Sequence, residues 1–441
     1  MKDSTSAAEI DEYLKRLFPI TRSLTGQGNR ETFQILEEIA PIVVTEYPSG
    51  TSAYDWKVPD EWVIRDAYIK DANGNRIVDF RECNLHVVSY SIPVNSEMAF
   101  ADLKPKLHRL ENNPDAIPYR TSYYSRDWGF CVTGRQFERL ESIPGMLNVH
   151  IDSEFRSDGS MSIGELIIPG HSEEEYLVST YCCHPSMAND NLSGLLTAAL
   201  LARGFLQGNK PQKSWRFIFV PETIGAIAYL HYNEVEMKSI EGGFVVTTCG
   251  GPGPLGYKES YLGDHLIDRA IRYAFKNIGL EPLHYPFRPD GSDERQYSSP
   301  GFRIPVATIT RDKYYEYSQY HTSLDNLDFV NGSQLLESFR LYCDVASILD
   351  LNRCYRSTAP YGEPQLSRRK LYPPIGGGLN QKDNTENSPN LENEIDVITW
   401  LLFTADGKQD LLSVAKRSNI EFSKLQIVAE KLTKDGLLES A

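Results

Sequence analysis

The stretch at residues 176–206 constrains the fold of this chain more than any other. It begins with an apolar run at residues 176–183. It ends with an apolar segment from Leu195 that contains no proline, and no glycine before Gly204. The first run predicts a buried strand, and the second predicts a helix that faces the core. A strand followed by a loop and a helix is the building unit of an α/β sheet.

The loop between this strand and this helix carries an imidazole and a carboxylate, those of His184 and Asp190. In an open α/β sheet, ligands bind beyond the carboxyl ends of the strands. Imidazole nitrogens and carboxylate oxygens are both common zinc ligands. A reading without metal is equally open at this point, in which His184 closes the strand end and Asp190 caps the helix.

Strands and helices alternate along the chain after Pro144, following two predicted helices near the start of the chain. Apolar runs of strand length predict strands, and apolar residues at helical spacing predict helices. The alternation predicts an α/β fold with a doubly wound, mostly parallel sheet. The remaining predicted strands are residues 163–168, 215–220, 244–248 and 304–309, and the predicted helices are residues 7–18, 30–40, 225–232, 266–277 and 332–349.

Residues 49–144 differ in character and predict a β-rich inserted domain. They hold three of the five tryptophans, and Asn73-Gly74 is a hairpin signal between two β-like runs. An aromatic run at residues 121–130 is more typical of packing than of ligand binding. The insertion would interrupt a discontinuous domain made of residues 1–48 and 145–354.

The C-terminal part of the chain has two sections. Residues 355–390 are rich in proline, glycine and asparagine, which predicts a linker or a surface strap. Residues 391–441 show three helical segments and a short β signal, the outline of a small winged-helix domain. This section has nine acidic and six basic residues, whereas a DNA-reading domain is normally basic. Protein contact or self-association is therefore expected here.

The charge and the cysteines narrow the expected partners and location. A net charge of −15 disfavours nucleic acid, because most nucleic-acid binding depends on neutralising phosphates. The N-terminus lacks the apolar core of a secretory signal, and no run reaches the roughly 18 apolar residues of a membrane helix. The seven cysteines are odd in number and form no CxxC pair. Free thiols in the cytoplasm are expected, with no membrane partner.

Further polar residues follow the predicted strands. Glu222 stands directly after the apolar run WRFIFVP, where an unpaired carboxylate would be costly to bury. The next strand ends at Thr247, Thr248 and Cys249. The last strand leads to Tyr320 and His321, with Asp325 close behind, and is preceded by Ser292, Asp293, Glu294 and Arg295.

Taken together, these segments resemble the zinc exopeptidase fold, in the branch of co-catalytic zinc aminopeptidases and glutaminyl cyclases. The similar segments are HPSMANDNLSG, ETIGAIAYL, GSDERQYSSPGFRIPVATI and YHTSLDN, within residues 145–350. The arrangement also resembles a bacterial aminopeptidase-like family with a β-rich insertion and a C-terminal winged helix. The resemblance implies His184, Asp190 and His321 as metal ligands and Glu222 as the general base.

Two departures from that branch bear on the metal. Thr223 stands where the branch has a second, metal-binding glutamate, and residues 245–250 lack its aspartate ligand. Three protein ligands and a water form the usual catalytic zinc site, so one zinc ion per chain is expected, with two still open. Cys249 is a candidate extra ligand, although a buried structural thiol is the commoner role. Support of the site or substrate binding is expected of Asp293, Glu294, Arg295, Tyr320 and Asp325.

The implied activity is hydrolysis of a peptide or amide bond in a small peptide or an amino-acid conjugate. A zinc-activated water would attack, and Glu222 would take its proton. Two alternatives stay open: an acyltransferase like glutaminyl cyclase, and a degenerate sensor or binding protein with the winged helix as output. Loss of two ligands favours the sensor, whereas retention of His184 and Glu222 favours an enzyme. A homo-oligomer formed through the winged helix or the insertion is a further expectation.

Overall fold

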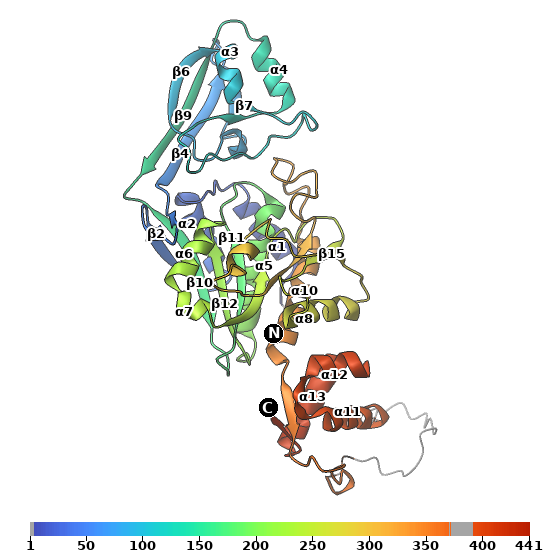
Figure 1. Cartoon of the computed structure of the whole chain (residues 1–441). Coiled ribbons are helices and arrows are strands. Elements are labelled where there is room, and N and C mark those ends of the chain that lie inside the picture. The colour runs from blue at the N-terminus through green and yellow to red at the C-terminus, as the bar shows by residue number, and fades with distance from the viewer. Residues whose placement is uncertain (1–3, 370, 372–390) are drawn as a thin grey trace. The chain divides into compact units, whose positions relative to one another are not determined.

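A central eight-stranded sheet organises the first of two units in the computed structural model, which describes residues 4–369, 371 and 391–441 (Figure 1). The units are residues 1–344 and 345–441. The sheet order is β1-β10-β12-β11-β13-β16-β14-β15, in which β12, β11, β13 and β16 run parallel. The strands are β1 Val43–Pro48, β10 Ser160–Ile168, β11 Glu175–Tyr181, β12 Ser214–Val220, β13 Ile240–Val245, β14 Leu255–Lys258, β15 Leu283–Tyr285 and β16 Val306–Arg311.

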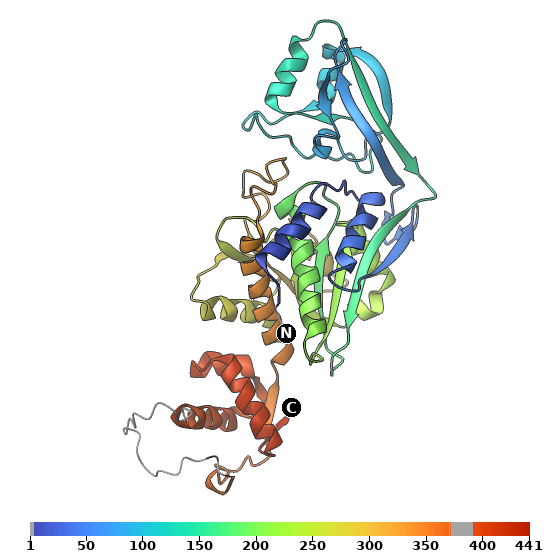
Figure 2. The same ribbon diagram turned by 180° about the vertical axis from the view of Figure 1, so that it is seen from behind.

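Helices cover both faces of this sheet. Helices α1, α2 and α5 lie on the face toward the viewer in Figure 2, and α6 lies on the face toward the viewer in Figure 1. The doubly wound, mostly parallel sheet predicted from the alternation of elements is therefore confirmed. The helices are α1 Ala7–Leu17, α2 Gln27–Glu37, α5 Ser193–Gln207, α6 Ile224–Tyr232, α7 Glu234–Met237, α8 Leu266–Asn277, α9 Glu294–Tyr297 and α10 Gly332–Leu351.

Strand β13 begins four residues earlier than the sequence indicated, and its glycines explain the difference. Gly242 and Gly243 resemble strand breakers in the sequence. In the structure, a β-carbon on Gly243 would lie 2.0 Å from the carbonyl oxygen of Leu177 on the neighbouring strand β11. The glycine therefore permits close pairing of β13 with β11 rather than ending the strand.

The inserted region forms its own antiparallel sheet, with the order β5-β4-β9-β6. The Asn73-Gly74 hairpin is present between β4 and β5: Gly74 has a φ of +87°, and the Asp71 carboxylate accepts hydrogen bonds from the backbone of Asn73 and Asn75. Strand β9 was not predicted, and it extends this sheet to Arg156. The elements are β2 Ser52–Ala53, β3 Trp56–Lys57, β4 Glu61–Lys70, β5 Arg76–Asp79, β6 Val94–Ala99, α3 Phe100–Leu103, β7 Leu107–His108, β8 Phe130–Cys131, α4 Gly134–Ser142 and β9 Met146–Arg156.

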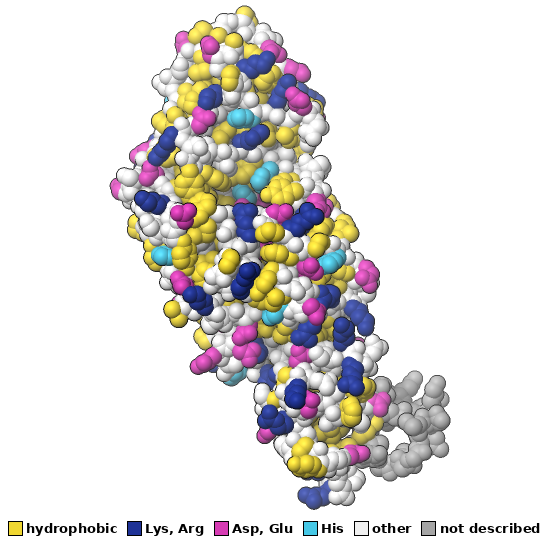
Figure 3. Space-filling model, viewed as in Figure 1, with side chains coloured by type: hydrophobic (Ala, Val, Ile, Leu, Met, Phe, Trp, Pro, Cys, Tyr) yellow, Lys and Arg dark blue, Asp and Glu magenta, His cyan; other side chains and the backbone are white. Residues whose placement is uncertain are grey.

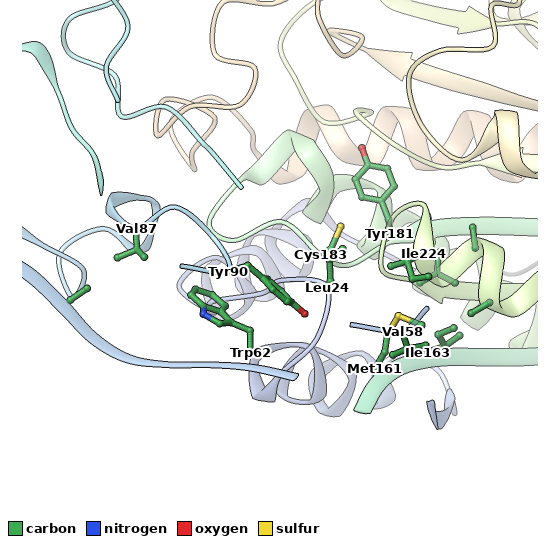
Figure 4. Packing of buried hydrophobic residues seen from close by; sticks show 14 of the residues in the cluster. Leu24, Val58, Trp62, Val87, Tyr90, Met161, Ile163, Tyr181, Cys183 and Ile224 are labelled. Carbon is green, nitrogen blue, oxygen red and sulfur yellow. The ribbon is translucent and has the colours of Figure 1, made fainter. Parts of the chain in front are cut away.

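One hydrophobic cluster runs from the inserted region into the α/β core (Figure 4). Trp62 and Tyr90 stack at 5.6 Å between ring centroids on the inserted side. Leu24, Tyr181 and Cys183 belong to the same cluster on the core side. The inserted region therefore packs as a continuation of the core.

The second unit contains a three-stranded sheet of order β18-β17-β19 and three helices. Residues 355–357, at the start of the predicted linker, belong to β17, which pairs with strands of the C-terminal sheet. Residues 370 and 372–390 of that predicted linker lie outside the described residues. The elements are β17 Cys354–Ser357, α11 Leu391–Thr404, β18 Asp406–Asp410, α12 Leu411–Ser418, α13 Phe422–Lys434 and β19 Leu438–Ser440.

Two further predictions concern the cysteines and membrane-crossing helices. All seven cysteines are free thiols, and four of them are buried. Across the part of the chain that the structure describes, every helix is too short or too polar to cross a membrane.

Candidate metal centre

His184 and Asp190 lie on the loop that leaves the carboxyl end of β11. Both flanks of this loop are buried, because β11 and α5 lie inside the α/β core. The His184 side chain is 6% exposed and that of Asp190 is 1% exposed, with Nδ1 of His184 3.4 Å from Oδ1 of Asp190. The core therefore brings the predicted pair together.

His321 reaches the same carboxylate from the loop between β16 and α10. Its Nε2 atom lies 3.0 Å from Oδ2 of Asp190, and its side chain is 34% exposed. Asp190 thus presents one carboxylate oxygen to each imidazole. Burial alone would raise the pKa of Asp190, yet the two imidazoles hold that pKa well below its usual range.

The three residues fit a zinc ion. Nδ1 of His184, Oδ2 of Asp190 and Nε2 of His321 are buried and have no hydrogen-bond partner. Zinc bonds of about 2.0–2.1 Å at tetrahedral angles place ligand atoms about 3.3 Å apart. The 3.0 Å between Nε2 of His321 and Oδ2 of Asp190 is close to that spacing. Nδ1 of His184 lies 3.4 Å from the other carboxylate oxygen, Oδ1, and one ligand atom from each of the three residues lies within 4.8 Å of the others. Such unpartnered buried atoms are costly unless a cation binds them.

Glu222 stands beside this group at the end of β12. Its Oε2 atom lies 3.7 Å from Nε2 of His184. Burial raises the pKa of the Glu222 carboxyl, and a raised pKa brings a carboxylate closer to the optimum for general-base catalysis near neutral pH. The thiol of Cys183 accepts a hydrogen bond from the Glu222 amide, which fixes the start of the turn.

Two threonines, Thr223 and Thr247, lie at strand ends near the centre. The Thr223 hydroxyl lies 3.4 Å from the guanidinium of Arg295, and its amide donates to Asp293. At the end of β13, the Thr247 hydroxyl lies 2.6 Å from the Tyr181 hydroxyl, which in turn donates to Asp190. A tyrosine hydroxyl therefore binds the carboxylate that faces both imidazoles.

Asp325 supports the loop that carries Asp190. Its carboxylate accepts hydrogen bonds from the backbone amides of Asn189, at 2.6 Å, and Asp190, at 3.0 Å, and from the hydroxyl of Tyr317. Burial raises the pKa of Asp325 to about 7. The predicted supporting residue thus holds the ligand loop through its backbone.

Of the other predicted residues, Asp293 and Tyr320 contact the centre, whereas Glu294 has other partners. Asp293 is buried next to Glu222, where burial and the charge of Glu222 raise its pKa well above the usual range. Tyr320 stacks on His321 with 4.0 Å between ring centroids. Glu294 instead accepts hydrogen bonds from Thr308 and Tyr314 and lies near the buried Lys258.

Cys249 is not brought to the metal-ligand group. Its thiol lies 3.5 Å from the hydroxyl of Thr197, behind the loop. Among the described residues, the candidate ligand groups are His184, Asp190 and His321, and Cys183, His184 and Glu222. The thiol that approaches the site is therefore Cys183.

Sequence reasoning missed three residues that contact the centre. The guanidinium of buried Arg22 donates from Nε to the carbonyl oxygen of His184 at 2.8 Å. Tyr181 binds Asp190, and Tyr119 of the inserted region packs against both histidines. Arg22 and Tyr119 are distant in sequence, and Tyr181 is part of an apolar run, so no local pattern marks them.

Strained backbone gathers around the centre. Ser186, Thr223, Thr248 and His321 have positive φ values of 34°, 67°, 43° and 53°. Non-glycine residues seldom adopt this region, and such strain clusters at functional sites. The loops at this sheet edge are therefore built for a specific geometry.

Two family models match the chain. One is described as a domain of unknown function (DUF4910) and matches residues 11–352. The other is a winged helix-turn-helix model that matches residues 353–440. The predicted C-terminal winged helix is confirmed by this match.

Known proteins with a similar sequence or fold are peptidase-like. A Clostridium acetobutylicum protein, provisionally named a polysaccharide biosynthesis protein with an aminopeptidase-like domain, is 41% identical over 436 residues, covering 99% of this chain and 97% of that protein. A crystal structure from the same organism, provisionally called a peptidase, has a TM-score of 0.88 at 40% identity, with 99% and 96% covered. BSAP, a zinc aminopeptidase of Bacillus subtilis, has a TM-score of 0.56 at 14% identity, with 78% and 95% covered. The zinc exopeptidase fold is therefore confirmed.

Proposed function

This chain belongs to the family described as the domain of unknown function DUF4910, and we propose that it is a metal-dependent hydrolase of the aminopeptidase type. It carries an aminopeptidase-like domain. The observation that carries the proposal is the set of unpartnered ligand atoms on His184, Asp190 and His321, with Glu222 beside them. Without a cation, these buried atoms approach one another at 3.0 to 3.4 Å but form no hydrogen bond, which is costly for buried polar groups.

The roles of the residues follow from their positions. His184, Asp190 and His321 would hold one zinc ion, which supplies a Lewis acid that polarises a carbonyl and lowers the pKa of water. Glu222 takes the proton of the attacking water and passes it to the leaving amine, a role worth about 10²–10⁴ in rate. Tyr181 and Asp325 keep the shared carboxylate and its loop in place.

The proposed substrate is a small peptide or an amino-acid conjugate. His184 and Asp190 are almost fully buried, and His321 is only partly exposed, which suits a small substrate end rather than a folded protein. The relative named for polysaccharide biosynthesis supports amide-linked conjugates as substrates to test. Basic and acidic side chains are interspersed on the face shown in Figure 3, which supports the expectation that nucleic acid is not a partner.

A non-catalytic sensor is the second candidate, because Thr223 stands where the related branch has a second glutamate and residues 245–250 contain no acidic side chain. Metal content separates the two candidates. The first measurement is elemental analysis of the purified wild-type protein, together with release of free amine from a panel of aminoacyl anilides. About one zinc ion per chain with hydrolysis supports the enzyme.

Two substitutions test the assigned roles. Glu222→Gln is expected to keep the zinc and lose hydrolysis, because the amide cannot accept the proton. His321→Ala is expected to lose both. Full activity in Glu222→Gln would show that another group is the base.

A further inference from the structure

The inserted region reaches the metal centre through residues 116–123, which lie between β7 and β8. The amide of Tyr119 donates to the carbonyl oxygen of His321 at 2.7 Å. The amide of Ser323 donates to the carbonyl oxygen of Ile117 at 2.9 Å, and the Ser323 hydroxyl accepts from the Ile117 amide at 3.0 Å. The loop that carries His321 is therefore paired, like a short strand, with a segment about 200 residues earlier in the chain.

This pairing places the ring of Tyr119 against both metal-site histidines. Its centroid lies 5.2 Å from that of His184, at an interplanar angle of 78°, and 5.2 Å from that of His321, at 88°. Tyr119 is 8% exposed, and its hydroxyl lies 2.9 Å from that of Tyr123. Edge-to-face contacts of this kind are favourable and orient the rings involved.

The inserted region, which contains this segment, also contacts the α/β core elsewhere. The hydroxyls of Ser23 and Ser89 lie 2.7 Å apart, and those of Thr25 and Tyr90 lie 2.6 Å apart. Trp62 and Tyr90 continue the hydrophobic cluster of the core (Figure 4). Because the two regions share a buried interface within one unit, the position of Tyr119 is fixed relative to the histidines.

We propose that the inserted region completes the metal centre and that Tyr119 is a positioning residue for the imidazoles of His184 and His321. Its ring restrains both imidazole planes, so that their nitrogens point at the shared carboxylate of Asp190. Metal affinity depends strongly on groups that orient the ligands, and loss of such a group typically weakens binding about 10–100-fold. This inference rests on the proposed metal site but concerns a residue outside the predicted ligand set.

The test measures zinc affinity by competition with a chromophoric chelator, and the visible spectrum of the cobalt-substituted protein. Tyr119→Ala is expected to bind zinc about 10-fold more weakly and to change the cobalt spectrum. Tyr119→Phe keeps the ring and is expected to restore both to the wild-type values. Tyr124→Ala is the matched control, since Tyr124 lies on the same loop, is 52% exposed and donates only to the carbonyl of Lys57.

Tyr119→Leu, which fills more of the space, guards against misfolding of the alanine variant and is expected to weaken zinc binding in the same way. Wild-type affinity and an unchanged cobalt spectrum in Tyr119→Ala or Tyr119→Leu would overturn the inference while leaving the proposed hydrolase intact. Absence of zinc binding by the wild-type protein would overturn the inference and the proposed function together.

Discussion

The two sides of the metal centre are built in different ways. His184 and Asp190 lie between a buried strand and a buried helix, and they are 6% and 1% exposed. His321 is 34% exposed and follows an aromatic loop. Tyr320 of that loop and Tyr119 of the inserted region pack against its ring. The first side is thus enclosed by the α/β core, whereas the second side is more exposed and packs against aromatic rings, including one from the inserted region.

The largest expected effect comes from the residue that connects the two sides. Asp325 follows His321 in the chain, yet its carboxylate binds the amides of Asn189 and Asp190. Asp325→Ala leaves two buried amides without partners, at a cost of about 1–3 kcal/mol each. The free energy of unfolding in urea should fall by about 2–6 kcal/mol, and zinc affinity should fall with it.

Asp328→Ala is the control for that experiment. Asp328 lies three residues further along the same loop and is exposed. Exposed substitutions of this kind usually change stability by less than about 0.5 kcal/mol. Equal stability of the two variants would mean that the loop of Asp190 holds its shape without Asp325.

The same comparison explains which parts of the site were predictable. The sequence predicts β11, α5 and the intervening His184 and Asp190, because apolar periodicity and strand-end position are local properties. His321 was identified only through a family resemblance, since its loop has no periodic pattern. Glu222 stood out because a carboxylate directly after a buried strand requires a reason.

The residues that were missed share a physical cause. Arg22, Tyr119 and Tyr181 are of types that most often pack in cores or lie at surfaces, and their roles arise from contacts with residues elsewhere in the chain. The early start of β13 has a similar cause, because Gly243 is required by the neighbouring strand. Contacts between distant segments are what sequence periodicity does not report.

A second, smaller effect concerns the junction that attaches the inserted region. The guanidinium of Arg30 on α2 binds Glu46 on β1 and Glu61 at the start of β4. The hydrogen bonds from Arg30 hold the pKa of Glu61 below its usual range. Burial raises the pKa of Glu46, but hydrogen bonds from Arg30, Ser160 and Ser162 together bring it below its usual range. A carboxyl whose pKa is depressed in the folded state contributes stability above its unfolded pKa and loses it as the pH falls.

Arg30→Met should therefore destabilise the protein by about 1–2 kcal/mol at pH 7, and this difference from the wild type should shrink as the pH falls below about 4.5. Urea unfolding at several pH values measures it. Arg16→Met removes an exposed ion pair with Glu38, a type of pair that contributes little to stability, and serves as the control. A pH-independent difference would assign the contribution of Arg30 to packing.

The smallest effect on stability and zinc content is expected near His184 and Asp190, for a substitution at a residue that does not contact the ligand group. The Cys249 thiol lies beside Thr197 and outside the ligand groups. In Cys249→Ser, the new hydroxyl can bond with Thr197, so stability should change by no more than about 1 kcal/mol, and zinc content should stay at the wild-type level. Cys183→Ser changes the acceptor of the Glu222 amide and should lower activity more than stability. Loss of zinc in Cys249→Ser, with zinc retained in Cys183→Ser, would instead identify the Cys249 thiol as a metal ligand.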